Sequence, residues 1–379
     1  MNERPRILIA IDKFKGCLSG RAVAASLRAG ILSENPDAQV VLHPVADGGD
    51  GFSDELTHHG FCRHVAETVD ALGRTIESSF VERAGTVVIE MALASGLQQI
   101  EAEDRRPLVA DTYGLGLLMR AATEHQPSTM IVGAGGSATS DGGAGALAAL
   151  GAVVRGGDGS ALSSYGPIAL RQARGVDVRP LAQWDGVAVY VATDVTNPLL
   201  GAEGAAKVFG PQKGATNDDI VKIEQGLERW ADILERARGR ELRNAPGAGA
   251  AGGLGFGLGL GLGAQRLDGL DTFARLSNLN SAIEGADLVI TGEGSFDAQT
   301  TSGKAPLGVL RHAQRIGRPC WVVAGRSDIS DAALRSLGFA GQRTLMQLAP
   351  DEESSMREAA RWLVRTGAEL MRVALPIAR

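Results

Sequence analysis

The stretch Met130-Ile-Val-Gly-Ala-Gly-Gly-Ser-Ala-Thr-Ser-Asp-Gly-Gly-Ala-Gly145 begins as an apolar run and continues as glycines, hydroxyl residues and one aspartate. This order predicts a buried strand, a glycine-rich loop and a helix that starts at about Asp141 or Gly142. Several N–H groups of such a loop can converge on one anion, because glycine has no Cβ and a helix N-terminus adds a positive dipole end. The stretch predicts an α/β unit with a phosphate site, unless the glycines serve only close packing.

The length and composition of the chain limit the possible architectures. At 379 residues the chain is too long for one ordinary core, which predicts two domains. Its 51 glycines follow no collagen-like period, so they must lie in turns, close helix contacts and ligand loops. A net charge of −6 leaves no diffuse basic surface, so we expect no nucleic-acid partner.

The chain carries no sequence signal for export or for a membrane span. Its N-terminus lacks the long apolar region of a signal peptide, which predicts a cytoplasmic protein. Residues 245–264 are uncharged, but glycines and Pro246 make them too weakly hydrophobic for a span and favour a tightly packed helix or loop. We therefore expect no membrane partner.

The cysteines and histidines show no metal-site spacing. Cys17, Cys62 and Cys320 form no C-x-x-C pair, which predicts free thiols. A metal site needs convergent ligands, so the sequence favours a solvated loop for the neighbouring histidines His58, His59 and His64.

The two ends of the chain share one pattern of hydrophobic residues, and the middle of the chain has another. The apolar run Ile7–Ile11 predicts a strand buried on both faces and Val40–Val45 predicts the next strand, each followed by an aspartate and a glycine. Helical patterns alternate with these strands, and similar βα units return after residue 286. Short alternating runs from His64 to Val88 predict antiparallel strands. We predict a discontinuous doubly wound Rossmann-like α/β domain of residues 1–64 plus 271–379. A second α/β domain of residues 65–270 is inserted into it, with the active site in a cleft between them.

Acidic residues end several of the predicted strands, namely Asp12, Asp47, Asp194, and Glu293 with Asp297. Lysines accompany them: Lys13, Lys15, Lys207, Lys213 and Lys304. Carboxylates can hold Mg²⁺, lysines can neutralise phosphate oxygens and a glycine loop can cradle a phosphate, which together indicate phosphoryl transfer. Ala305 follows Gly303-Lys304 where a Walker A motif needs Ser or Thr, so any nucleotide site is of another type. Each aspartate taken singly can instead be a helix cap.

Two other classes of function stay open at this point. The pattern Gly133-x-Gly135-x-x-Ala138 after a strand satisfies the dinucleotide fingerprint in its Gly/Ala variant, which would make the protein an oxidoreductase. Arg155 stands where that fingerprint expects the ribose-binding acid, so an NADP enzyme is the form of this alternative. A non-catalytic anion sensor would need the glycine loops but not so many carboxylates.

Eight motifs in order along the chain resemble those of the bacterial type I glycerate kinases. They are Asp12-Lys-Phe-Lys-Gly, Val45-Ala-Asp-Gly-Gly-Asp-Gly, Glu90-Met-Ala-Leu-Ala-Ser-Gly-Leu, Gly135-Gly-Ser-Ala-Thr-Ser-Asp-Gly-Gly, Asp194-Val-Thr-Asn-Pro-Leu, Phe209-Gly-Pro-Gln-Lys-Gly-Ala, Pro246-Gly-Ala-Gly-Ala-Ala-Gly-Gly and Thr291-Gly-Glu-Gly-x-x-Asp-x-Gln. The resemblance implies two domains and ATP- and Mg²⁺-dependent phosphorylation of D-glycerate. The expected product is 2-phosphoglycerate, as in glyoxylate and glucarate catabolism.

Residue chemistry placed on these motifs gives the expected site. Asp194 is predicted as a metal ligand or as the base for the hydroxyl, and Lys15 and Lys213 as the groups that neutralise charge. The predicted substrate or phosphate contacts are Gly135, Gly136, Ser137, Thr139, Asp141, Asp47, Gly48, Asn197 and Lys304. The predicted metal ligands are Asp194, Glu293 and Asp297. Which anion the loop from Gly135 to Gly143 holds stays open, and so does the oligomeric state, with a homodimer as one option.

The chain departs from the family pattern at four positions, which are Lys13, Cys17, Ser140 and Ser295. An arginine commonly stands at the last of them in the family. The loss of that guanidinium could change the preference for a phosphate or carboxylate substrate.

Overall fold

The computed structural model of the protein describes residues 4–296 and 305–374. The chain divides into two compact units. Unit 1 combines Met1–Asp47 with Leu270–Arg379, and unit 2 is the continuous segment Gly48–Gly269. The first crossing lies between residues 47 and 48 rather than near residue 64, because the helix that follows the crossing packs on strands of unit 2.

Unit 1 contains a five-stranded parallel sheet with the order β13-β12-β11-β1-β2. The strands are β1 (Arg6–Ile9), β2 (Gln39–Leu42), β11 (Leu288–Phe296), β12 (Cys320–Ser327) and β13 (Gly341–Thr344). Because β2 and β11 flank β1 on opposite sides, the strand order reverses between β1 and β11. In doubly wound sheets, ligands bind beyond the carboxyl ends of the strands at such a switch point.

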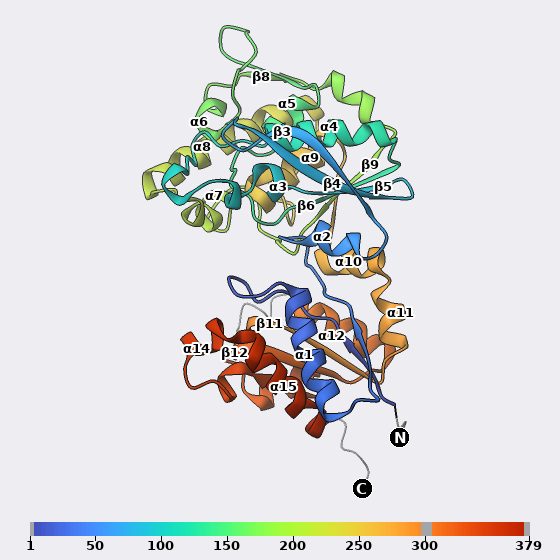
Figure 1. Cartoon of the computed structure of the whole chain (residues 1–379). Coiled ribbons are helices and arrows are strands. Elements are labelled where there is room, and N and C mark those ends of the chain that lie inside the picture. Colours follow the sequence, from blue (N-terminus) through green and yellow to red (C-terminus); the bar gives the residue numbers. More distant parts are fainter. Residues whose placement is uncertain (1–3, 297–304, 375–379) are drawn as a thin grey trace. The chain divides into compact units, whose positions relative to one another are not determined.

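Helices cover the unit 1 sheet, and the first and last of them pack together. The helices are α1 (Gly20–Glu34), α10 (Gly269–Ser277), α11 (Leu279–Glu284), α12 (Ala305–Ile316), α13 (Asp331–Leu337), α14 (Glu352–Arg357) and α15 (Ala359–Ala374). Ser19 caps the start of α1, because its hydroxyl accepts a hydrogen bond from the Ala22 N–H at 3.3 Å. Figure 1 shows α1 (blue) beside α15 (red), where apolar residues of both helices join the core of the sheet.

Unit 2 contains a six-stranded mixed sheet with the order β10-β9-β6-β5-β4-β3 and a separate β7-β8 pair. The strands are β3 (Cys62–Val69), β4 (Thr75–Arg83), β5 (Thr86–Glu90), β6 (Thr129–Gly133), β7 (Val153–Arg155), β8 (Gly175–Asp177), β9 (Ala188–Ala192) and β10 (Gln265–Leu267). The predicted antiparallel pairs are present as β3-β4 and β4-β5, while β5, β6, β9 and β10 run parallel. His64 lies half-buried in β3, so the prediction of a solvated loop was wrong for it.

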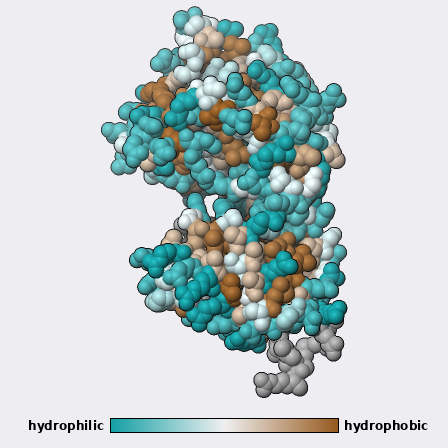
Figure 2. Space-filling view, viewed as in Figure 1, coloured by the Kyte–Doolittle hydropathy of each residue, from teal (hydrophilic) through white to brown (hydrophobic). Residues whose placement is uncertain are grey.

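The unit 2 helices are α2 (Phe52–Thr57), α3 (Ala92–Ser95), α4 (Tyr113–Ala122), α5 (Ala144–Ala149), α6 (Pro167–Leu170), α7 (Ala205–Phe209), α8 (Asn217–Arg238) and α9 (Ala250–Gly261). The uncharged stretch of residues 245–264 contains α9, which is kinked at residues 251–253 and almost entirely buried. Within residues 4–296 and 305–374, no helix is both long and apolar enough to cross a bilayer. On the face seen in Figure 2, apolar residues form small groups among hydrophilic ones.

Candidate active site

Three carboxylates gather at the carboxyl ends of neighbouring unit 1 strands. Asp12 follows β1, Asp47 follows β2, and Glu293 lies in the last part of β11. The backbone brings two of them together, because the Asp12 N–H donates to the Gly292 carbonyl at 3.1 Å. The cluster therefore lies at the β1/β11 switch point, where the topology favours a ligand.

The electrostatics of this cluster suit a cation. The pKa of Asp12 is raised to about 7: burial is the largest cause, the Lys13 charge opposes it, and the charges of Asp47 and Glu293 add to the rise. The Lys13 ammonium lies 3.6 Å from Asp12 Oδ1. Oxygen ligands from several carboxylates are what Mg²⁺ prefers, so this donor set fits the ion that the sequence implied.

The predicted metal ligands are divided between the two units. Glu293 belongs to the unit 1 cluster, whereas Asp194 belongs to unit 2. Asp297 and Lys304 lie outside the described residues. Lys15 is exposed in a tight turn, in which Phe14 pairs with Leu18 and Gly16 has a φ of +73°.

In unit 2, the glycine loop follows β6 and interleaves with the segment that follows the first crossing. The Gly135 N–H donates to the Gly48 carbonyl at 3.3 Å. A Cβ on Gly135 would lie 2.3 Å from the Gly49 Cα, so only glycine permits this approach. Gly136 is exposed, whereas Ser137 is 8% exposed, so only the first part of the loop is accessible to solvent.

The second part of the loop is interior and does not begin a helix where predicted. Gly142 and Gly143 have left-handed φ values, and α5 begins only at Ala144. The buried Asp141 carboxylate accepts hydrogen bonds from backbone N–H groups at the start of α5. Its Oδ2 accepts from Gly145 at 2.9 Å and its Oδ1 from Gly143 at 3.3 Å. The helix N-terminus is thus occupied by a protein carboxylate and offers no dipole site to a phosphate.

Asp141 also fixes the start of α4. Its Oδ2 accepts hydrogen bonds from the Thr112 N–H at 2.9 Å and from the Thr112 hydroxyl at 2.7 Å. The neighbouring Asp111 accepts from the Tyr113 and Tyr165 N–H groups, and burial together with the Asp141 charge raises its pKa to about 7. Because both Asp141 oxygens are engaged within the protein, we propose that it positions the loop and does not contact substrate.

Lys213 contacts the interior part of the loop. Its side chain is 2% exposed, and its ammonium donates to the Thr139 carbonyl at 2.5 Å. Two hydroxyl oxygens of the same segment, Thr139 Oγ1 and Ser140 Oγ, are buried and have no hydrogen-bond partner among the residues that the structure describes. This placement makes Lys213 a residue that positions the loop, and we propose that role in place of direct charge neutralisation.

Asp194 and Asn197 organise the turn after β9. Asp194 is half-buried, and its Oδ1 accepts from the N–H of Gly269, the first residue of α10. That distance is 2.8 Å. The Asn197 side-chain amide donates to the Glu203 carbonyl at 2.8 Å, and the backbone carbonyl of Asn197 accepts from the Gly249 N–H. The hydrogen bond from Gly269 therefore holds one carboxylate oxygen of Asp194 in place.

Sequence reasoning missed four residues that shape these sites. Glu90 lies in one of the eight motifs but was given no role, and it accepts from the Gly51 and Ser53 N–H groups at the start of α2. Asp50 lies beside the exposed part of the glycine loop, because a Cβ on Gly136 would be 2.5 Å from Asp50 Oδ1.

The other two missed residues are arginines. The Arg326 guanidinium donates to Ser295 Oγ at 3.2 Å from the adjacent strand, so it stands beside the position where the family carries an arginine. Arg105 donates to the Gln212 carbonyl, next to Lys213. The sequence Asp47-Gly-Gly-Asp50 could have indicated Asp50, because a second acid follows the strand-end aspartate after two glycines. The partners of both arginines depend on tertiary packing.

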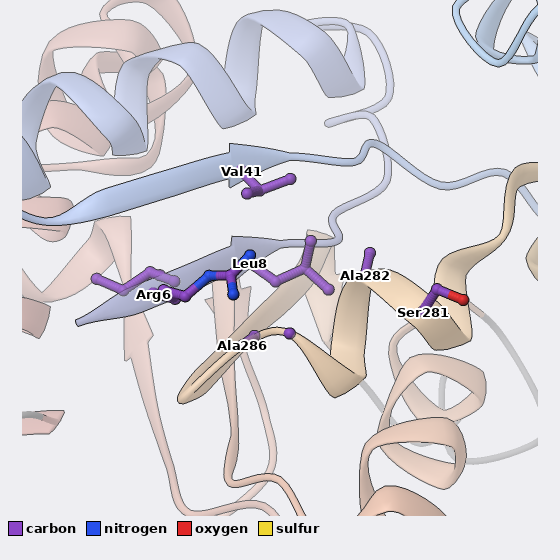
Figure 3. Close-up of a pocket in the computed structure, with 8 residues that line it drawn as sticks. Arg6, Leu8, Val41, Ser281, Ala282 and Ala286 are labelled. Carbon is purple, nitrogen blue, oxygen red and sulfur yellow. The ribbon is translucent and has the colours of Figure 1, made fainter. Parts of the chain in front are cut away.

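A small pocket in unit 1 is separate from the carboxylate cluster. It is lined by residues of β1 such as Arg6, by Val41 of β2, and by residues of α11 and of the turn after it, such as Ser281 (Figure 3). The cluster lies at the opposite, carboxyl ends of the same strands. The pocket is therefore no part of the candidate active site.

The topology of unit 2 removes the basis for the oxidoreductase alternative. A dinucleotide fold needs the strand after the glycine loop and helix to return parallel beside the first. Here β7 pairs antiparallel with β8 in a separate sheet, and the parallel neighbours of β6 are β5 and β9. Arg155 lies in β7 and donates to the Gly159 carbonyl, away from any ribose position of that type.

A model described as the glycerate kinase family matches residues 7–375. The chain belongs to this glycerate kinase family. It is 38% identical over 369 residues to the glycerate kinase of Bacillus subtilis (strain 168), and the match covers 96% of each chain. It is 40% identical over 325 residues to the glycerate 2-kinase of Escherichia coli (strain K12), and that match covers 84% of this chain and 85% of the relative.

A solved structure supports the same assignment to the glycerate kinase family. The crystal structure of a Salmonella typhimurium LT2 protein provisionally named glycerate kinase 2 matches with a TM-score of 0.83 at 34% identity. The match covers 98% of both chains. The predicted α/β class is confirmed, and the chain is a small-molecule kinase by family.

The ionisation of Lys213 gives this glycerate kinase family member a testable pH dependence. Burial lowers its pKa to about 7, although the Asp141 charge opposes the shift. Above pH 7 the unfolded chain keeps a proton that the folded chain releases, so this residue makes the unfolding free energy rise with pH. Below pH 7 the buried charge lowers stability in full.

We expect the unfolding free energy of the native chain, relative to Lys213→Met, to grow by up to about 1.4 kcal/mol per pH unit above pH 7. Urea unfolding of both proteins at a series of pH values measures this difference. Taking the difference cancels groups common to both proteins, such as Cys320, whose pKa burial raises. A difference that does not vary with pH would contradict a buried lysine that loses its proton near neutrality.

Proposed function

We propose that the chain transfers the γ-phosphate of ATP to the 2-hydroxyl of D-glycerate, giving 2-phosphoglycerate. The observation that carries this proposal is the cluster of Asp12, Asp47 and Glu293 at the switch point of a doubly wound sheet. The names of the relatives support glycerate as the acceptor. An ATP-dependent reaction also agrees with the cytoplasmic location that the sequence predicts.

In this proposal the three carboxylates hold Mg²⁺. The ion, when bound, neutralises phosphate oxygens and the charge that develops on them. Lys13, beside Asp12, keeps the cluster from carrying its full negative charge before nucleotide binds. Asp194 removes the proton of the attacking hydroxyl, and the Gly269 N–H holds its carboxylate in one orientation.

The glycine loop then contributes its accessible residues, Gly135 and Gly136. The carboxylate of Asp50 lies beside Gly136 and repels a bare anion there. A substrate hydroxyl can donate to that carboxylate, and a phosphate can approach it only together with a cation. We therefore propose that this part of the loop binds the hydroxyl-bearing end of glycerate or a Mg²⁺-bound phosphate.

Phosphorus NMR of the product tests the reaction and its position together. We expect ADP formation that requires both D-glycerate and Mg²⁺, with a product phosphorus signal split into a doublet. A phosphate on C2 couples to one proton, whereas a phosphate on C3 couples to two and gives a triplet. A triplet would overturn 2-phosphorylation while leaving the kinase assignment intact.

Two controls separate the kinase from its alternatives. Other small hydroxy acids, offered in place of glycerate with ATP, test the acceptor. Glycerate offered with NADP and without ATP tests for hydride transfer. ATP turnover that does not depend on glycerate, or hydride transfer without ATP, would contradict the proposed function.

A further inference from the structure

A second group of metal-binding side chains lies in unit 2, formed by His64, Glu82 and His125. One imidazole nitrogen from each histidine and one carboxylate oxygen all lie within 4.8 Å of one another. His64 is on β3 and Glu82 on β4, whereas His125 ends the short 3-10 helix that follows α4. In the strand register His64 faces Phe80, two residues before Glu82, so both ligands project from the same face of the sheet.

The local contacts leave this group prepared for a ligand. His64 Nε2 is buried and has no hydrogen-bond partner among the residues that the structure describes. Glu82 is oriented by the Gly85 N–H, which donates to Oε1 at 3.0 Å. The centroids of the two imidazole rings are 4.0 Å apart, and both rings contact the ring of Phe80, which restricts their rotation.

The donor set selects a class of ion. Two imidazoles and one carboxylate are ligands of Zn²⁺ and of neighbouring divalent transition metals, whereas Mg²⁺ prefers oxygen ligands. With metal–ligand distances near 2.0–2.1 Å, tetrahedral ligand atoms lie about 3.3 Å apart, so only small side-chain rotations are needed to close the site. A water molecule would complete the shell.

We propose that His64, Glu82 and His125 form a structural site for Zn²⁺ or a similar divalent transition metal. The site lies beside the amino ends of β5 and β6, because Glu82 precedes the β4-β5 turn and His125 precedes β6. Glu90 and Gly133 lie at the carboxyl ends of the same two strands, where the glycine loop begins. The ion ties strand β3, at the edge of the sheet, to the segment between α4 and β6 and takes no part in phosphoryl transfer.

Calorimetric titration of the full chain with Zn²⁺, after removal of bound metal by chelation, tests the proposal. We expect one saturable site per chain and a rise in the thermal unfolding midpoint when Zn²⁺ is added. His64→Ala, His125→Ala and Glu82→Gln should each weaken binding at least tenfold. The glutamine variant keeps an oxygen that accepts from Gly85, so it removes charge with the least change in structure.

A matched control is His58→Ala, since His58 is an exposed histidine of the same unit outside the cluster. It should bind Zn²⁺ as the native chain does. The Mg²⁺-dependent turnover of the three ligand variants should stay within about twofold of the native value. Absence of saturable binding in the native chain, or native affinity in all three variants, would overturn the site. Loss of turnover in step with metal loss would overturn its structural role.

Discussion

Replacing Asp194 by asparagine lowers kcat by about 10²–10⁴-fold if this carboxylate removes the hydroxyl proton, which is the usual range for a positioned acid or base. The substitution is well suited to the test. The asparagine side chain would keep an oxygen that can accept from the Gly269 N–H, the 2.8 Å contact that fixes the native carboxylate. The loss would therefore report the missing charge and proton acceptor, with little disturbance of the turn.

Steady-state kinetics with glycerate and ATP measure this effect. Asp185→Asn is the matched control, because Asp185 is exposed and precedes β9, at the other end of the strand that Asp194 follows. We expect native kcat in the control. If Asp194→Asn retained kcat within about threefold, the base would have to be another group, because acid–base catalysis is worth far more than that.

The second large effect concerns Gly252 in the kink of α9. Gly252 has a φ of +69°, and a Cβ there would lie 1.9 Å from the Thr139 carbonyl oxygen. Its own carbonyl accepts from the Gly142 N–H at 3.0 Å, so the kink packs directly on the interior part of the glycine loop. An added methyl group has to displace that loop, together with the carbonyl that Lys213 contacts.

We expect Gly252→Ala to lower the unfolding free energy by about 2–5 kcal/mol, the sum of left-handed strain and overpacking. Gly263→Ala is the control, because Gly263 has the same φ of +69° and a Cβ there would meet no atom within 4 Å. It should lose only about 1–2 kcal/mol. Urea unfolding at constant slope compares the two variants, and equal losses would show that the contact with Thr139 relaxes without cost.

Much of the fold was predictable because its signals are local. Apolar runs followed by an acid and a glycine predicted β1 and β2, although β1 is buried and β2 is partly exposed, and the alternating runs predicted β3 and β4. The start of α5 was not predictable in this way. Gly142 and Gly143 turn left-handed where Gly142 donates to the distant Gly252 carbonyl, a tertiary contact, and Gly143 donates to the nearby Asp141 carboxylate.

The candidate site divides along the same line. Residue type identified Asp12, Asp47 and Glu293 as strand-end acids, although the predicted metal set included Asp194. The sequence does not show which side chains are accessible to solvent, and it led to the prediction that Lys213, Thr139 and Asp141 contact a ligand. In the structure all three side chains are buried. The group of His64, Glu82 and His125 joins three segments far apart in sequence, which no spacing rule detects.

The way unit 2 is inserted also sets an order of events during synthesis. Ile7 in β1 pairs with Leu288 in β11, so the central pairing of the unit 1 sheet waits until about three quarters of the chain has left the ribosome. Unit 2 is continuous and can complete its own core before that point. Until β11 arrives, β1 and β2 form at most a two-stranded sheet, which is marginally stable by itself. We expect the N-terminal strands to be the part of the nascent chain that most needs protection by chaperones.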